Sequence, residues 1–454
     1  MPDERSMCHL RTIAPARNDD GMALATVMAM SVILFMLATT LVMLAAQQQI
    51  TTSKFIARNK TLQVADAGIT AYLYQLRYDS RYYVAHPTMG PVATTEGSWT
   101  VTASRASGSA PVMLSSVGEI PSLGSRQTIV ATARFPSFSD YMIVMNVSYD
   151  LSPGFKVMGK VYSNGDVTND GEITGHVYAK GSVRGSGRFD AGFTEQCVKP
   201  TIDYSGIKAD MSLLKAAAQN SGTYFHSSTG LGYRVTLNGN GGTYQIVTSV
   251  NGTTGSLTLS GTPISFTIPT SPFDGVLFFD DDFGYGSRAR VWIDGTYSQP
   301  VTVVSSSEQV DDSNNGLGGS TGGTNANSAF FIIGRLMPSD TNSTAVCGLV
   351  APGDTSIPIW YNTIQALYKN AGTELDIWAA MISQKGTLHV DANSHSIAKL
   401  YVRGSRTALQ AGNFTGLPAN GLVFEYDYRF NQQPPPLFPI IRDGSMTVDS
   451  WIEN

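Results

Sequence analysis

Few side chains in this sequence are spaced for chemistry. Gly318-Gly-Ser-Thr-Gly322 fits the turn that presents a nucleophilic serine, but neither the preceding strand nor the following helix is predicted around it. His389 and His395 lack the spacing of a metal-binding helix, and we interpret them as surface residues. Asp280-Asp281-Asp282 offers carboxylates that suit calcium, yet without EF-hand spacing we favour a charged turn. We therefore expect no catalytic residue, no metal and no cofactor, and predict that the protein is not an enzyme.

The N-terminal region contains the most informative element of the chain. An uncharged, apolar run extends from Met22 to Ala46, and as a helix it would be roughly 37 Å long, enough to cross a bilayer core. The segment before it, Met1 to Asp20, is long, polar and mixed in charge. Gly21 precedes the apolar block instead of following it, which is the wrong order for a secretory signal peptide. The sequence thus predicts a membrane helix and not an ordinary secretory signal.

This order of segments resembles the type IV pilin class, and within it the PilX-type pilus-assembly proteins. The matching features are Gly21, the apolar run, and Ala65-Asp66-Ala67-Gly68-Ile69, which is similar to the Ala-Glu-Ala-Gly motif of the family. The resemblance implies a processing site between Gly21 and Met22, cut by a prepilin peptidase. Most pilins have Glu at the fifth mature position, where this chain has Thr26, and we interpret the difference as typical of a minor subunit.

The pattern stays helical beyond the apolar run. No proline occurs between Met22 and Arg77, so the simplest interpretation is one transmembrane and stem helix of roughly 80 Å. Strands are predicted at Trp99–Ala103, Val112–Val117 and Gln127–Phe135, and these could form a small pilin-like sheet.

A repeat of sixteen residues marks the next region. Gly159-Lys-Val-Tyr-Ser-Asn-Gly165 recurs as Gly175-His-Val-Tyr-Ala-Lys-Gly181, and short strands separated by glycine turns at a fixed period favour a β-solenoid. A β-sandwich with glycine turns is the alternative. Solenoids can carry enzymes whose acids converge in a groove, but this stretch offers only the scattered carboxylates Asp166, Glu172 and Asp190.

Two segments interrupt the β pattern. Ser205 is a plausible N-cap for an amphipathic helix that ends at Gly222, and Asp311 to Ser328 has the composition of a mobile loop. Near the C-terminus, Phe424 to Pro439 resembles an uncharacterised domain that follows PilX-like N-termini in envelope proteins.

Cys8 belongs to the predicted leader, which leaves Cys197 and Cys347 in an exported and oxidising compartment. A disulfide between them and two small buried thiols are both open alternatives, because their distance in space does not follow from the sequence. Neither cysteine belongs to a CxxC pair, so metal or redox chemistry gains no support.

Together these patterns predict an α+β protein that is mainly β. The formal net charge of −5 without a basic patch argues against nucleic-acid binding. We expect a minor pilin-like subunit, single-pass in the cell membrane with an extracytoplasmic head for assembly or adhesion, whose partners are the prepilin peptidase, other pilin subunits and the pilus assembly machinery. The alternatives are a membrane-anchored β-helix enzyme acting on polysaccharide and a non-pilus envelope protein. The predicted parts are a leader at 1–21, the transmembrane and stem helix at 22–80, a pilin-like β head at 81–145, a solenoid-like domain at 146–440 and a tail at 441–454.

Overall fold

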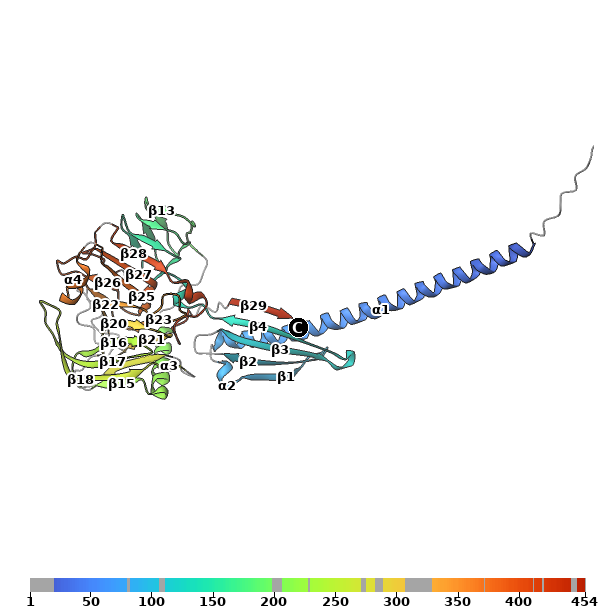
Figure 1. The fold of residues 1–454 in the computed structure, drawn as a ribbon, viewed down its shortest axis with the longest axis horizontal. Helices are drawn as coiled ribbons and strands as arrows, with labels where there is room; N and C mark the ends of the chain where they lie inside the picture. Colours follow the sequence, from blue (N-terminus) through green and yellow to red (C-terminus); the bar gives the residue numbers. More distant parts are fainter. Residues whose placement is uncertain are drawn as a thin grey trace, which may run out of the picture.

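The computed structural model describes residues 20–79, 82–105, 111–197, 206–227, 229–270, 275–281, 289–306, 329–370, 372–410, 412–418, 420–441 and 447–453. It has a long N-terminal helix, a small antiparallel sheet on the C-terminal half of that helix, and a large β-rich head (Figure 1). The predicted α+β class, mainly β with a long apolar N-terminal helix, is confirmed. The leader before Asp20, Ser205, Asp282 and the loop from Asp311 to Ser328 lie outside the described residues.

Helix α1, Asp20–Tyr78, runs for 59 residues without interruption. No proline breaks its hydrogen bonds, and its apolar half has side chains that pack on nothing in the described chain; Phe35 is 70% exposed and Val42 68%. The hydroxyl groups within this half bond back to the helix, as when Thr40 Oγ1 donates to the Met36 carbonyl at 2.7 Å. These polar side chains are therefore satisfied without water.

The second half of α1 packs against an antiparallel sheet with strand order β1-β2-β3-β4-β29. Its buried side chains recur at helical spacing on one face: Thr61, Val64, Ala65, Ile69, Tyr72 and Leu76. The strands are β1 Thr88–Ala93, β2 Ser98–Arg105, β3 Val112–Ile120, β4 Ser125–Arg134 and β29 Thr447–Glu453, with the short helix α2 Tyr82–Ala85 and the 3₁₀ turn η1 Pro121–Leu123 between them. The three predicted strands correspond to β2, β3 and β4. We call α1 from Thr61 onward, together with this sheet, the stem.

Two glycines let the helix and the sheet of the stem approach closely. A Cβ added to Gly68 in α1 would lie 2.5 Å from Ser116 Oγ of β3. A Cβ added to Gly118 in β3 would lie 2.5 Å from the Thr61 carbonyl oxygen and 2.7 Å from Ala65 N, both backbone atoms of α1. Ala65, Gly68 and Ile69 of the sequence motif thus lie on the contact face of the helix, where Gly68 allows the close approach, while Asp66 and Ala67 are exposed.

The chain returns to the stem at its C-terminus. Strand β29 lies in the predicted tail and pairs antiparallel with β4, with Trp451 opposite Ala131. The structure also moves the predicted boundary at 145/146, because β5, Ile143–Met145, pairs in parallel with β27 and β8 of the head. At the junction, Ile440 bridges to Ser137. Residues 137–441 therefore form the head, and both of its ends connect to the stem.

The first part of the head consists of short strands that pair in parallel. Their register offset is sixteen residues, as in the pairs of Glu172 with Lys156 and of Glu172 with Arg188. The strands of this part are β6 Tyr149–Leu151, β7 Lys156–Met158, β8 Val161–Ser163, β9 Val167–Asn169, β10 Glu172–Ile173, β11 Val177–Ala179, β12 Val183–Arg184, β13 Arg188–Phe189 and β14 Phe193–Thr194, preceded by the 3₁₀ turn η2 Phe138–Asp140. The sixteen-residue repeat of the sequence is therefore the spacing at which equivalent strands pair.

The second part of the head continues the parallel pairing with longer strands, and β28 joins it to the first part through β7. Its strands are β15 Tyr224–Ser227, β16 Gly232–Gly239, β17 Gly241–Val250, β18 Leu257–Thr267, β19 Val276–Asp281, β20 Arg290–Tyr297, β21 Val301–Ser305, β22 Phe330–Pro338, β23 Cys347–Ala351, β24 Thr355–Pro358, β25 Glu374–Ser383, β26 Leu388–Asp391, β27 Lys399–Ala408 and β28 Leu422–Tyr426. One hydrophobic core runs through both parts.

An antiparallel meander, two helices and a 3₁₀ turn of the head depart from this parallel pattern. Strands β16, β17 and β18 form an antiparallel meander. Helix α3, Gly206–Ser221, confirms the predicted amphipathic helix and buries Leu214 and Ala218 against the core. Helix α4, Asn362–Tyr368, and the 3₁₀ turn η4, Tyr428–Asn431, complete the head.

Candidate functional site: the apolar helix and the charged face of the head

The apolar half of α1 is the first candidate functional surface. From Leu24 to Ala46 its side chains are exposed on every side of the helix, and the helix is long and apolar enough to cross a membrane. A helix that is apolar all round has no stable place in water. The predicted processing residues Gly21 and Met22 lie in the first turn of α1, and their side chains are outside the described residues.

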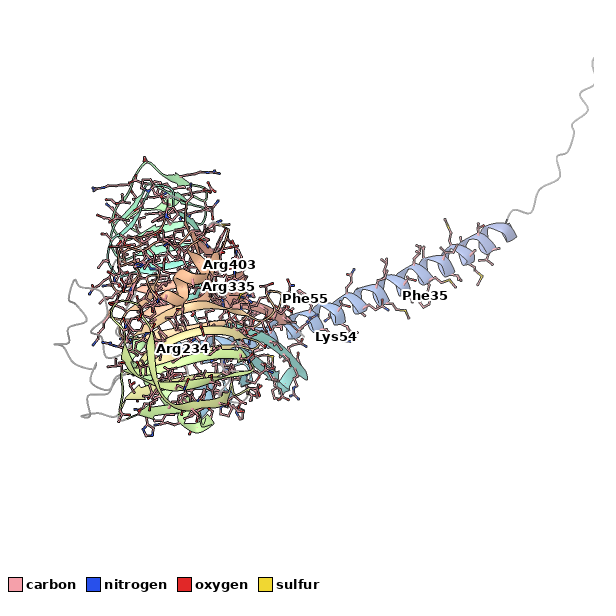
Figure 2. The ribbon with its side chains drawn as sticks, turned by 60° about the vertical axis from the view of Figure 1, so that its left-hand side comes forward. Phe35, Lys54, Phe55, Arg234, Arg335 and Arg403 are labelled. Carbon is pink, nitrogen blue, oxygen red and sulfur yellow. The ribbon has the colours of Figure 1, made fainter. Side chains whose placement is uncertain are left out.

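The second candidate surface is a set of charged side chains, one on each of nine strands of the head that pair in parallel; some neighbours are offset by two residues, since the direct partner of Arg234 is Trp292 and that of Asp376 is Tyr401. Figure 2 shows three of its members, Arg234, Arg335 and Arg403, along one side of the molecule. The sign of the charge alternates from each strand to the next in the order β16, β20, β22, β25, β27, β28, β7, β10 and β13. We call this set the charged stripe; its residues are Arg234, Asp294, Arg335, Asp376, Arg403, Glu425, Lys156, Glu172 and Arg188.

The alternation produces ion pairs between neighbouring strands. Arg403 lies between two acids, with Nη1 2.8 Å from Asp376 Oδ1 and Nε 2.9 Å from Glu425 Oε2. Arg234 pairs with Asp294 at 2.6 Å. Burial raises the pKa of Asp376, and the Arg403 guanidinium opposes that rise. Opposite charges on paired strands stabilise a sheet by about 0.2–1 kcal/mol each, whereas like charges destabilise it. The stripe therefore favours one register of these strands.

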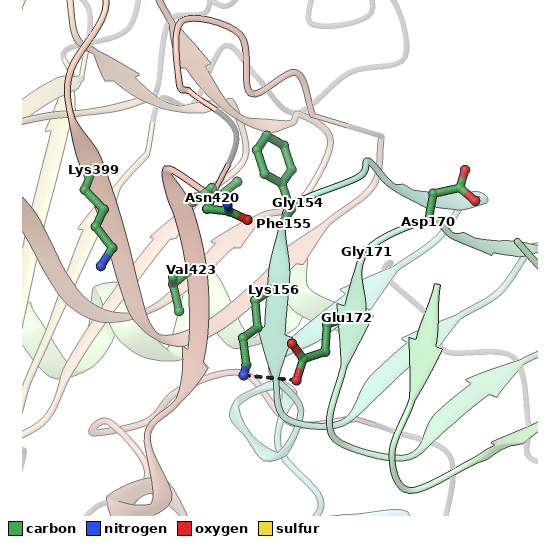
Figure 3. Close-up of a pocket in the computed structure, with 10 residues that line it drawn as sticks. Gly154, Phe155, Lys156, Asp170, Gly171, Glu172, Lys399, Asn420 and Val423 are labelled. Atoms are coloured by element: carbon green, nitrogen blue, oxygen red, sulfur yellow. Dashed lines mark ion pairs between the residues drawn. The ribbon is translucent and has the colours of Figure 1, made fainter. Parts of the chain in front are cut away.

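A hollow of about 360 Å³ borders the charged stripe at Lys156 and Glu172. It lies where Val423 of β28 stands between Tyr401 of β27 and Lys156 of β7 in the register of the sheet. Figure 3 shows Lys399 on one side of Val423 and Lys156 on the other, with Lys156 Nζ 3.0 Å from Glu172 Oε1. The residues that line the hollow are Gly154, Phe155, Lys156, Asp170, Gly171, Glu172, Lys399, Asn420, Leu422 and Val423.

Asp170 and Lys399 are each fixed by neighbours of the hollow. The backbone N–H and the hydroxyl of Ser186 both donate to Asp170 Oδ1 at 3.0 Å, and these hydrogen bonds lower the pKa of Asp170. Lys399 Nζ donates to the Tyr401 hydroxyl and lies 3.3 Å from Glu374 Oε1. The hydrogen bonds from Ser186 hold the Asp170 carboxylate in its charged form.

The structure separates the three acids that the sequence singled out in the repeat. Glu172 lines the hollow, whereas Asp166 Oδ1 accepts the Ser182 N–H at 2.8 Å and Asp190 pairs with Arg188 at 2.5 Å. This part of the charged stripe does have a pattern in the sequence. Lys156, Glu172 and Arg188 recur every sixteen residues with alternating charge, which would have predicted that they are neighbours. Lys399 joins the hollow from a distant segment without any such signal.

Two residues of the acidic cluster, Asp280 and Asp281, lie in a strand and not in the charged turn that we favoured. Asp280 lies within β19, and its side chain is only 1% exposed. Its Oδ2 is 2.8 Å from Lys215 Nζ of α3 and accepts the Tyr224 hydroxyl at 2.9 Å. Burial and the Asp280 carboxylate raise the pKa of Tyr224 to about 12, so this phenol stays protonated as a donor. No cluster of three potential metal ligands occurs among the residues that the structure describes.

The two histidines differ in their surroundings. His395 is exposed, as predicted, whereas His389 on β26 is half-buried, with Nδ1 2.9 Å from Thr387 Oγ1. Burial lowers the pKa of His389, opposed by the charges of Asp354 and Asp391 and reinforced by that of Arg406. The prediction of a solvated surface residue is therefore wrong for His389, because this side chain, although on the face of β26 opposite to the buried Leu388 and Val390, is partly covered by its neighbours.

A pH effect on stability follows from the lowered pKa of His389. The unfolded chain binds a proton at this histidine as the pH falls through about 6.5, while the folded protein resists it, so the free energy of unfolding decreases toward acid. We expect His389→Gln to reduce the fall in melting temperature between pH 7 and pH 5. His395→Gln is the matched control and should leave the fall unchanged. An equal fall of the melting temperature in the wild type and in His389→Gln would contradict the view that His389 causes this loss of stability.

Both remaining cysteines are buried free thiols. Cys197 donates its backbone N–H to the Ala179 carbonyl beside β11, and Cys347 on β23 stands opposite Val301 of β21. Burial raises the pKa of Cys347 well above its ordinary value, which keeps this thiol protonated. Of the two alternatives left open by the sequence, the structure contains the pair of buried thiols and not the disulfide, because each cysteine packs among its own neighbours.

Comparison with known proteins gives no family. No protein-family profile and no curated protein matches the sequence. One solved structure that is similar is the ice-binding protein from the Antarctic ascomycete Antarctomyces psychrotrophicus, at 7% identity and a TM-score of 0.26, covering 64% of this chain and 96% of that one. A TM-score this low carries no argument about function.

Proposed function

We propose that this protein is a minor pilin-like subunit, anchored in the cell membrane by α1 and presenting its head on the extracytoplasmic side for assembly or adhesion. The observation that carries the proposal is the division of α1 into two halves. The first half exposes apolar side chains on every side, and the second half buries one face under the sheet of the stem. One continuous helix thus joins a segment suited to lipid to a folded base.

The stem supports the same interpretation. The motif residues Ala65 and Gly68 lie on the buried face of α1, where the sheet approaches the helix backbone. A sheet covering only the second half of α1 leaves the first half free for lipid or for the helices of other subunits. The prepilin peptidase, other pilin subunits and the assembly machinery are the partners that the proposal implies.

For the head we propose a β-solenoid. The support is the parallel pairing of equivalent residues at a constant offset of sixteen, for example Val161 with Val177 and Val177 with Phe193. Stacked coils of this kind bury a shared core that no single coil could form. A β-sandwich, the alternative, would instead pair neighbouring strands of the chain in antiparallel fashion.

Maturation at Gly21 tests the proposed function directly. We expect N-terminal sequencing of the protein from its native membrane to begin at Met22. Gly21→Leu should abolish processing and leave the protein at full length, because a bulky side chain precedes the scissile bond. Met22→Leu is the matched control on the other side of the bond and should still be processed. The same mature N-terminus in wild type and Gly21→Leu would contradict the proposal.

The alternative of an enzyme on a β-helix needs acids and bases that converge in a groove. In the hollow, Lys156 and Glu172 neutralise each other as an ion pair, and Lys399 pairs with Glu374. We retain the prediction that the protein is not an enzyme. A non-pilus envelope protein would share the anchor but would not be cut at Gly21, so the processing experiment distinguishes the two.

A further inference from the structure

The hollow is a break in an otherwise regular arrangement of side chains. In one row of the sheet, next to the charged stripe, β27 presents Tyr401 and β7 presents Lys156, but β28 presents Val423 between them. The valine side chain is shorter than those of Tyr401 and Lys156 and extends less far from the sheet. Lys399 and Lys156 therefore face each other across a gap that no side chain of β28 fills (Figure 3).

The groups around this gap are balanced in charge and in hydrogen bonding. The ammonium groups of Lys156 and Lys399 are donors, and the carboxylates of Asp170 and Glu172 are acceptors. Their formal charges sum to zero, so the hollow offers no net attraction to an ion. Both lysine side chains remain about one-third exposed, at 37% for Lys156 and 33% for Lys399, and can reach a ligand.

The remaining lining is apolar or amide. Phe155, Leu422 and Val423 are among the residues that line the hollow, and Asn420 adds an amide that both donates and accepts. The volume of about 360 Å³ falls at the small end of ligand pockets, which start at roughly 300 Å³. A ligand that fits this set is small, uncharged, rich in hydroxyl groups that donate and accept together, and apolar on one side.

We propose that the hollow binds one neutral sugar residue. The carboxylates of Asp170 and Glu172 accept from its hydroxyl groups, the ammonium groups of Lys156 and Lys399 donate to them, and the apolar face of the ring packs on Phe155 and Val423. Lys156 and Lys399 are already paired with Glu172 and Glu374, so the carboxylate of a uronate would find no unpaired cation among the residues that line the hollow. The ammonium of an amino sugar would find Glu172 paired in the same way and Asp170 already accepting two hydrogen bonds from Ser186. The proposal concerns the head alone and does not depend on the membrane anchor.

Saturation-transfer NMR on the full-length protein, in a detergent without a sugar headgroup, tests the proposal. The probes are the methyl glycosides of glucose, galactose, mannose and N-acetylglucosamine, with glucuronate and glucosamine as charged competitors. We expect at least one neutral glycoside to bind with a Kd in the millimolar range and both charged sugars to bind at least tenfold more weakly. Absence of binding by all four glycosides, or equal binding of a charged sugar, would overturn the proposal.

Two variants locate the binding. Val423→Phe fills the hollow without changing a charge and should weaken binding at least tenfold, with an unchanged circular dichroism spectrum to show that the head is folded. Lys399→Met is a second variant for the case that Val423→Phe does not fold. It removes one hydrogen-bond donor and should also weaken binding. Arg188→Met alters the charged stripe outside the hollow and should bind as wild type does. Undiminished binding in folded Val423→Phe and in Lys399→Met would exclude the hollow as the site.

Discussion

Gly118→Val is expected to loosen the stem by about 1–3 kcal/mol or more, the usual cost of overpacking. The added side chain would meet the Thr61 carbonyl oxygen and Ala65 N, which are helix backbone atoms and cannot rotate away. The sheet must therefore move off the helix. Hydrogen exchange should report this as roughly 5- to 150-fold faster exchange of the amides of β2, β3 and β4.

The matched control is Gly252→Val, in the exposed turn between β17 and β18. No heavy atom lies within 4 Å of a Cβ built at Gly252, so the same substitution meets open space there. In the Gly252→Val variant, the amides of β2, β3 and β4 should exchange at the wild-type rate. Unchanged stem exchange in Gly118→Val would show that the close helix–sheet contact is not needed. Faster exchange confined to the head would place the strain elsewhere.

Immunogold labelling of sheared filaments is expected to find this protein at filament ends and not along the shaft. The head, residues 137–441, is much wider than the stem that bears it (Figure 1), and a head of that width cannot be packed at every position of a thin filament. Thr26 also lacks the carboxylate that pilins are thought to offer to a neighbouring amino terminus. A subunit with nothing ahead of it has no need of that charge.

The test compares two antibodies on the same filament. An antibody against the shaft subunit should decorate the full length, while an antibody against the head should give sparse or terminal labels. Dense head labels along the shaft would contradict the minor-subunit proposal. Head antibody bound to cell membranes and never to filaments would support the non-pilus alternative.

The sequence alone determined the features that depend on neighbouring residues. An apolar run of this length without proline favours a membrane-spanning helix, and α1 contains the predicted helix from Met22 to Arg77. The sixteen-residue repeat likewise predicted the offset at which Val161 meets Val177, because each coil repeats the same local turns. The amphipathic helix α3 was predicted by its own periodicity.

The tertiary structure decided what depends on contacts between distant segments. Strand β29 completes the stem sheet by pairing with β4, which lies far earlier in the sequence. No local pattern in 441–454 indicates that partner. Lys399 and Val423 meet the first coils because β28 pairs with β7, and Asp280 is buried because α3 brings Lys215 to it. Such pairings are fixed by the packing of the whole core, whose free energy is shared among segments that have no sequence relation to each other.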